Sequence, residues 1–138
     1  MVLRGGEILA WDGSGIVEPE IDDRITILYT DEWFIAANKT GNLPVHPAGR
    51  YFNNTLVSLL EDRYGRKVYP VHRIDRETSG VMLLAFDGKS ADALSESLAK
   101  GSKEYLALVH GNFPDKEMVV DLPLGRDRES VVSKKQKA

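Results

Sequence analysis

Residues 72–80 read HRIDRETSG and run directly into the apolar segment Val81–Phe86. Inside this stretch the carboxylate of Asp75 has an arginine on either side, Arg73 and Arg76. Nearby positive charge favours the ionised form of a carboxylate. An ionised carboxylate suits a nucleophile or a stabiliser of a cationic sugar, whereas a general acid needs an apolar setting without cations. The stretch therefore predicts a functional, ionised aspartate in a loop that leads into an apolar strand.

The flanking sequence predicts further strands. Ile25–Tyr29 and Trp33–Asn38 are short, rich in β-branched or aromatic residues, and separated by an acidic turn, which is typical of a β-hairpin. Val81–Phe86 and Tyr105–His110 have the same apolar and β-branched character, so both are predicted to be strands. These four segments predict a sheet whose strands come from residues 25–110.

Two helices are predicted between the strands. Apolar residues at helical spacing predict a helix over Thr55–Tyr64, with Asn54 as its N-cap and Gly65 just past its end. A second helix is predicted from about Ser90 to Lys100, because the pattern stops at Gly101. Helices packed on a mixed, mainly antiparallel sheet make the expected fold class α+β.

Composition limits the class of protein. The chain has 138 residues, 42% hydrophobic and 28% charged, which is typical of a soluble globular protein, and its longest apolar run, Val81–Phe86, is too short to cross a bilayer. Without cysteine there are no disulfides or thiolate metal ligands, which fits a reducing compartment, so we expect a cytoplasmic protein. The three histidines, His46, His72 and His110, lack the spacing of a zinc site, and no metal is expected.

The net charge of −3 is unevenly spread along the chain. Residues 1–32 hold two basic and eight acidic side chains, a net of −6, which leaves +3 for residues 33–138. Charge runs are usually solvated faces, but the neighbouring motif makes a phosphate-binding strip an equal alternative. The basic residues of that expected strip are Arg63, Arg66, Lys67, Arg73 and Arg76.

The stretch HRIDRETSG resembles the H-R-L-D-R-x-T-S-G signature of the RluA-type family of RNA pseudouridine synthases, with Ile74 in place of leucine as the only departure. Two weaker segments follow the order and spacing of that family: residues 27–47, which contain NKTGNLPVHP, and Lys103–Gly111, which reads KEYLALVHG. A further departure is Thr40, where the family usually has proline. The agreement of several segments in order makes the resemblance specific.

The resemblance covers roughly residues 25–133, and the family's later T-G-R-x-H-Q-I-R segment does not occur before Ala138. It implies that residues 25–138 are the N-terminal portion of a pseudouridine synthase catalytic domain. Residues 1–24 are then a polar leader, either a linker or the remnant of an upstream domain. We therefore expect this 138-residue chain to be inactive alone, with an open sheet edge through which it can self-associate.

The resemblance also implies an activity and roles for single residues. The expected activity is the isomerisation of uridine to pseudouridine in structured ribosomal or transfer RNA, without a cofactor. Asp75 and Tyr105 are the expected catalytic residues, with the tyrosine stacked on the uracil and its hydroxyl handling a proton. Four residues are expected to bind RNA or substrate: Arg73, His72, Arg76 and Lys39.

Other classes of function fit less well. A hydrolase that used Asp75 with His72 as base would need a leaving-group acid in an apolar pocket, and no second carboxylate has such a setting in the sequence. Ser79 lacks a G-x-S-x-G elbow, and residues 88–90 lack the upstream glycine of a phosphate-binding loop. A catalytically silent RNA-binding module is the more serious alternative, because basic residues are present while the later catalytic segment is absent.

Overall fold

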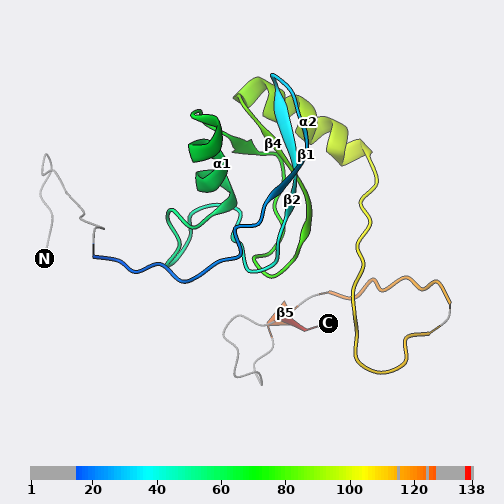
Figure 1. Cartoon of the computed structure of the whole chain (residues 1–138). Coiled ribbons are helices and arrows are strands. Elements are labelled where there is room, and N and C mark those ends of the chain that lie inside the picture. Colours follow the sequence, from blue (N-terminus) through cyan, green and yellow to red (C-terminus); the bar gives the residue numbers. More distant parts are fainter. Residues whose placement is uncertain (1–14, 115, 124, 127–135, 138) are drawn as a thin grey trace, which may run out of the picture. The chain divides into compact units, whose positions relative to one another are not determined.

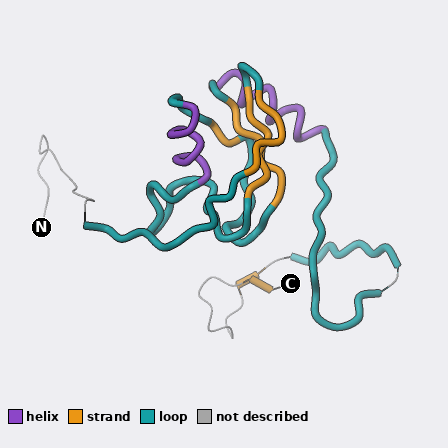
Figure 2. The backbone as a smooth tube through the Cα atoms, in the orientation of Figure 1, coloured by secondary structure: helices purple, strands orange, loops and turns teal. Residues whose placement is uncertain are grey.

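The computed structural model describes residues 15–114, 116–123, 125–126 and 136–137. The chain divides into two compact units, one that ends at Lys103 and one that begins at Glu104. Both described helices and the four-stranded sheet lie in the first unit, as Figures 1 and 2 show. Neither of these helices has the length and hydropathy needed to cross a membrane.

The sheet of the first unit has the strand order β1-β2-β4-β3. Its strands are β1 (Thr26–Thr30), β2 (Phe34–Lys39), β3 (Tyr69–Pro70) and β4 (Gly80–Ala85). Each neighbouring pair in this sheet runs antiparallel. With two helices beside it, the sheet confirms the predicted α+β fold.

Strands β1 and β2 form the predicted hairpin, and an aspartate explains its turn. The Asp31 carboxylate accepts the backbone N–H groups of Trp33 at 2.8 Å and Phe34 at 2.9 Å. The Asp31 N–H in turn donates to the Phe34 carbonyl at 3.1 Å. Aspartate favours such turns because its side chain bonds the backbone two or three residues on. The acidic turn seen in the sequence therefore closes the hairpin.

One face of the sheet forms the core. Side chains alternate between the two faces of a strand, so the buried positions of β2 lie beside the buried positions of β4. Burying an apolar side chain of this size contributes about 1.5–3 kcal/mol. The fully buried apolar residues that β2, β4 and the first helix bring together are Ile35, Ala37, Met82, Leu84, Leu56 and Leu60.

The first helix, α1 (Leu56–Tyr64), begins one residue later than predicted. Its N-cap is Thr55 and not Asn54, because the Thr55 hydroxyl accepts the Ser58 N–H at 3.2 Å. The C-terminal prediction is confirmed: Gly65 caps the helix in the left-handed conformation, with φ of 64°. Glycine adopts this conformation without steric cost.

The second helix, α2 (Gly88–Lys100), begins two residues earlier than predicted because Asp87 caps it. The Asp87 carboxylate accepts the Ser90 N–H at 2.9 Å. The predicted end before Gly101 is confirmed. Figure 1 shows α1 and α2 on opposite sides of the sheet. Both faces of the sheet are therefore at least partly covered.

The strand predicted over Tyr105–His110 is wrong. This segment has no regular structure, and the side chains of Leu106 and Leu108 are fully exposed. A strand requires a hydrogen-bonded neighbour, and β-propensity mainly reflects how a residue fits a half-buried surface. In the second unit, the described strands are the short pair β5 (Gly125–Arg126) and β6 (Gln136–Lys137). A local pattern without a partner was not enough to form a strand.

Candidate active site

The motif HRIDRETSG forms the loop between β3 and β4, at the end of the sheet where Lys39 pairs with Gly80. The Asp75 carbonyl accepts the Thr78 N–H at 3.1 Å, so Asp75 opens a tight turn. Gly80 then enters β4 with φ of 137°, a value that favours glycine. The Asp75 side chain is exposed. The predicted catalytic carboxylate is therefore accessible on a short, turned loop.

His72 anchors the beginning of this loop to β4. Its Nε2 accepts the Leu83 N–H at 3.2 Å, while the Val71 N–H donates to the Leu83 carbonyl at 2.9 Å. The imidazole thus continues the β3–β4 pairing where the backbone of the strand has ended. Burial lowers the pKa of His72, and the positive charge of Lys103 lowers it further. Its position favours a structural role, and the RNA contact expected of it stays a prediction.

Lys39 holds the middle of the motif loop through a hydrogen bond to its backbone. Its side chain is fully buried, and its ammonium donates to the carbonyls of Thr40 and Leu43, both at 2.8 Å, and of Arg76 at 3.0 Å. The Leu43 N–H also donates to the Arg76 carbonyl, at 3.1 Å. An ammonium has three donors, and all three are used here. This position favours a structural role for Lys39 over the expected phosphate contact.

Two acidic groups of the motif also act on the buried ammonium through their charges. Burial lowers the pKa of Lys39, whereas the negative charges of Glu77 and Asp75 raise it. The backbone approaches closely at the same place, since a Cβ on Gly41 would lie 3.1 Å from the Glu77 carbonyl oxygen. Glycine is the residue that permits such an approach. Close packing and charge together set the position of the loop.

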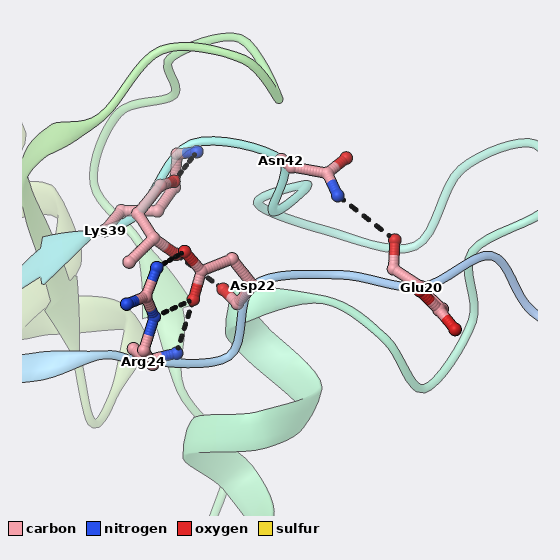
Figure 3. A network of polar contacts seen from close by, with 6 residues as sticks. Glu20, Asp22, Arg24, Lys39 and Asn42 are labelled. Carbon is pink, nitrogen blue, oxygen red and sulfur yellow. Dashed lines mark hydrogen bonds and ion pairs between the residues drawn. The ribbon is translucent and has the colours of Figure 1, made fainter.

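The described part of the predicted leader contacts the turn that follows β2 (Figure 3). The Thr40 hydroxyl donates to the Asp22 carbonyl, and the Asn42 amide donates to the Glu20 carbonyl at 3.2 Å. Arg24 donates to the Asp22 carboxylate at 2.8 Å, and this hydrogen bond lowers the pKa of Asp22 to about 2. Residues 1–14 lie outside the described residues. The boundary predicted at residue 24 stays a prediction, although the described residues of this polar segment belong to the first unit.

The two arginines that flank Asp75 differ in their contacts. Arg76 donates through Nε to the Glu77 carboxylate at 2.8 Å and through Nη1 to the Tyr51 hydroxyl at 2.6 Å. The Glu77 hydrogen bond is the main cause that raises the pKa of Arg76, and Arg76 lowers the pKa of Glu77. Arg73 is exposed and, within the described residues, has no hydrogen-bond or ion-pair partner. Arg73 is therefore the less constrained of the two arginines, and the RNA contact expected of each stays a prediction.

The expected strip of basic residues is divided between the two ends of the sheet. The Arg66 guanidinium lies 3.3 Å from the ring centre of Phe86 and 3.5 Å from the Glu32 carbonyl, beside the start of β2. The Arg76 carbonyl contacts Lys39 at the other end of β2. Six residues of strand span roughly 17–20 Å. Arg66 therefore lies at the end of β2 away from the motif loop, and the phosphate-binding strip stays a prediction.

One predicted site residue, Tyr105, lies in the other unit, and one residue at the motif loop, Tyr51, was not predicted. Tyr105 lies in the unit that begins at Glu104 and is 70% exposed, so Asp75 and Tyr105 belong to different units. Tyr51, which contacts Arg76, was not predicted. No sequence signal could have found it, because it lies 25 residues before its partner.

Other candidate sites lie elsewhere or lack ligands. A shallow apolar pocket between the hairpin and α2 is lined by Trp33, Phe34 and Leu94, at the end of β2 opposite to the motif. In the described part of the chain, no three acidic or histidine side chains gather as a metal site. The motif loop is therefore the strongest candidate site.

Comparison with known proteins identifies the family. A family model described as RNA pseudouridylate synthase matches residues 33–138. The mitochondrial tRNA pseudouridine(32) synthase of Saccharomyces cerevisiae is 36% identical over 125 residues, which cover 89% of this chain and 27% of that protein. The tRNA pseudouridine synthase C of Haemophilus ducreyi is 39% identical over 72% of this chain and 42% of that protein.

A solved structure, human RNA pseudouridylate synthase domain containing 1, is similar with a TM-score of 0.47 and 21% identity, over 61% of this chain and 31% of that chain. The chain thus spans less than half the length of each of these relatives. The family match, in contrast, covers more than three quarters of the chain and includes the whole motif loop. This chain belongs to the RNA pseudouridylate synthase family.

Proposed function

We propose that the protein containing this chain isomerises uridine to pseudouridine in structured RNA, with Asp75 as the reacting carboxylate. The observation that carries the proposal is the exposed Asp75 on a loop that Lys39 and His72 hold against the sheet. A fixed loop suits catalysis because a reacting group must be held near its productive geometry. The family match supports the type of reaction.

The proposed reaction is an internal rearrangement of the nucleotide. The bond between N1 of uracil and C1′ of ribose breaks, the base turns, and C5 bonds to C1′; C5 loses a proton and N1 gains one. The product has the same atoms as the substrate. A carboxylate beside an anomeric carbon stabilises positive charge on the sugar, as in glycosidases. Asp75 serves either as the nucleophile or as the charge partner of the ribosyl cation.

The target nucleotide must leave its stack to reach Asp75. Flipping costs a few kcal/mol, and stacking on one aromatic ring returns about 1–3 kcal/mol. We assign the stacking ring to Tyr105 on the basis of the resemblance. The remaining free energy comes from cations that bind phosphate. Arg73 supports this role because its side chain is exposed.

Transfer RNA is the substrate class that we propose first. The yeast and Haemophilus relatives are both named as tRNA pseudouridine synthases. Ribosomal RNA is the second class, from the resemblance alone.

We also propose that the chain can self-associate through an open sheet edge. Strand β1 is an edge strand of the described sheet, and Leu28 and Tyr29 on it are more than half exposed.

The test replaces Asp75 by asparagine in the full-length protein. Asparagine keeps the shape of the side chain and loses the charge, so we expect pseudouridine formation to fall by at least about 1000-fold. The measurement is single-turnover release of tritium from transfer RNA labelled at C5 of uridine. RNA affinity, measured in parallel, should change by less than about threefold, because Asp75 carries no positive charge to bind phosphate.

Asp62→Asn is the matched control, because Asp62 is an exposed aspartate on α1, outside the motif loop. It should retain full activity. Appreciable turnover by Asp75→Asn would exclude Asp75 as the reacting carboxylate. No turnover by the unsubstituted protein on any uridine-containing RNA, with RNA binding intact, would favour the silent RNA-binding module.

A further inference from the structure

Tyr51 and Glu77 hold the guanidinium of Arg76 from two sides. Glu77 accepts from Nε and Nη2, and the Tyr51 hydroxyl accepts from Nη1 at 2.6 Å. The Arg76 Cζ also lies 5.6 Å from the centre of the Tyr51 ring. The next residue before Arg76 is the proposed catalytic Asp75. Two side chains therefore fix the direction of the cation that follows the proposed catalytic residue in the chain.

The guanidinium of Arg76 still has N–H groups that are free to donate to a ligand. A guanidinium carries five N–H groups, and within the described residues three of those of Arg76 are used. One N–H therefore remains on Nη1 and one on Nη2. A pair of N–H groups on the two terminal nitrogens matches the spacing of two phosphate oxygens. Arg76 is partly exposed, so an RNA phosphate can reach it.

The contact with Glu77 does little for the stability of the fold. The side chains of Arg76 and Glu77 are 43% and 67% exposed. An exposed ion pair contributes little to stability, because water screens both charges. The pair therefore acts on the orientation of Arg76 more than on folding. The two N–H groups of Arg76 that make no contact with Glu77 or Tyr51 stay available to a ligand.

The Tyr51 side of the arrangement is built on a fixed loop. Ala48 and Tyr51 exchange backbone hydrogen bonds of 3.0 and 3.1 Å. The next three residues, Phe52 to Asn54, donate their N–H groups to the Glu18 carboxylate at 2.8–2.9 Å. A carboxylate that accepts three successive backbone N–H groups holds that segment in one conformation. Tyr51 is thus presented to Arg76 by a segment that is fixed on both sides.

We propose that Tyr51 is a positioning residue of the RNA site, which orients the Arg76 guanidinium to bind a backbone phosphate of the RNA next to the nucleotide held at Asp75. The proposal rests on the proposed function for the identity of the ligand. Preorganised cations bind more tightly because less side-chain entropy is lost on binding. Removal of the Tyr51 hydroxyl should therefore weaken RNA binding only through Arg76.

The test is a double-mutant cycle on the full-length protein, with transfer RNA binding measured over a series of salt concentrations. The variants are Tyr51→Phe, Arg76→Ala and the double variant. Arg76→Ala should lower the slope of log affinity against log salt by about one unit, because one phosphate contact is lost. Tyr51→Phe should weaken binding by about 3–10-fold in the native background and less than about twofold in the Arg76→Ala background.

Two controls make the cycle specific. Tyr69→Phe removes the hydroxyl of an exposed tyrosine on β3 and should leave affinity and salt slope unchanged. Arg76→Lys keeps the charge without the planar fork, and Tyr51→Phe should have a smaller effect in that background.

An unchanged salt slope in Arg76→Ala would overturn the phosphate contact. An equal loss from Tyr51→Phe with and without Arg76 would show that Tyr51 acts on the fold or touches the RNA directly, and would overturn the positioning role. The cycle reads binding and not turnover. An active Asp75→Asn variant would therefore refute the proposed chemistry and leave this result intact.

Discussion

The motif loop His72–Gly80 and the segment Tyr105–His110 both follow the same family pattern, yet among the described residues only the first is held by hydrogen bonds to other parts of the chain. The loop has the Lys39 ammonium beneath it, the His72 imidazole at its start and β4 at its end. The second segment is exposed and has no regular structure. The difference teaches that a motif is ordered by its tertiary partners and not by its own residues.

Among the variants that test this comparison, Lys39→Met should cause the largest loss of stability. Methionine keeps much of the volume and loses the donors, so the carbonyls of Thr40, Leu43 and Arg76 lose their partner. Unsatisfied buried acceptors cost about 1–3 kcal/mol each, and removal of a buried charge offsets part of this. We expect a loss of about 2–4 kcal/mol in the free energy of unfolding, measured by urea denaturation.

Lys100→Met serves as the control, because Lys100 is an exposed lysine in the last turn of α2. Its loss should change the free energy of unfolding by less than about 0.5 kcal/mol. Equal stability of the two variants would show that the buried ammonium does not hold the motif loop.

A smaller effect is expected from pH acting on His72. Burial lowers the pKa of His72 below its ordinary value of 6.5, so the folded protein binds the proton less tightly than the unfolded chain. The neutral imidazole therefore stabilises the fold above pH 6.5, and this stability is lost as the pH falls through the lowered value. His72→Gln keeps an acceptor for the Leu83 N–H and does not titrate.

The measurement is the free energy of unfolding at about pH 7.5 and about pH 5, made on the native chain and on the His72→Gln variant, so that every other titrating group is common to the two proteins. The native chain should lose more stability on acidification than the His72→Gln variant does. The same loss in both would mean that His72 does not accept the Leu83 N–H in its neutral form.

The smallest effect should come from Leu106→Ala. Leu106 is fully exposed, so its truncation should change the free energy of unfolding by less than about 0.5 kcal/mol. Leu84→Ala is the matched control, because Leu84 is fully buried in β4 and its truncation should cost about 2–5 kcal/mol. A cost above about 1 kcal/mol for Leu106→Ala, rising with protein concentration, would reveal burial of the segment between copies of the chain.

Much of the first unit could be predicted from local patterns. The hairpin, both helices and β4 were found within two residues, because hairpin turns, caps and apolar spacing are local features. The errors also have local causes: Thr55 caps the first helix in place of Asn54, and Asp87 caps the second helix so that it begins two residues before Ser90. Neighbouring polar residues have similar capping strength, so sequence alone does not choose between them.

The candidate site was predicted less completely. The sequence singled out Asp75 and Arg73, and the structure leaves both exposed. It could not show that Lys39 is buried, because a lysine at the end of a strand is usually exposed. It also could not join Tyr51 to Arg76, since that contact depends on how two distant loops meet.

The sequence by itself determined the family, the identity of the catalytic aspartate that we propose, and the α+β class, because these depend on residue types in order along the chain. Only the tertiary structure decided which charged groups are buried, which arginine is held and which is open, and which apolar segment becomes a strand. The physical reason is that burial, hydrogen bonding and strand pairing each require a partner. Partners far apart in the chain are brought together only by the fold.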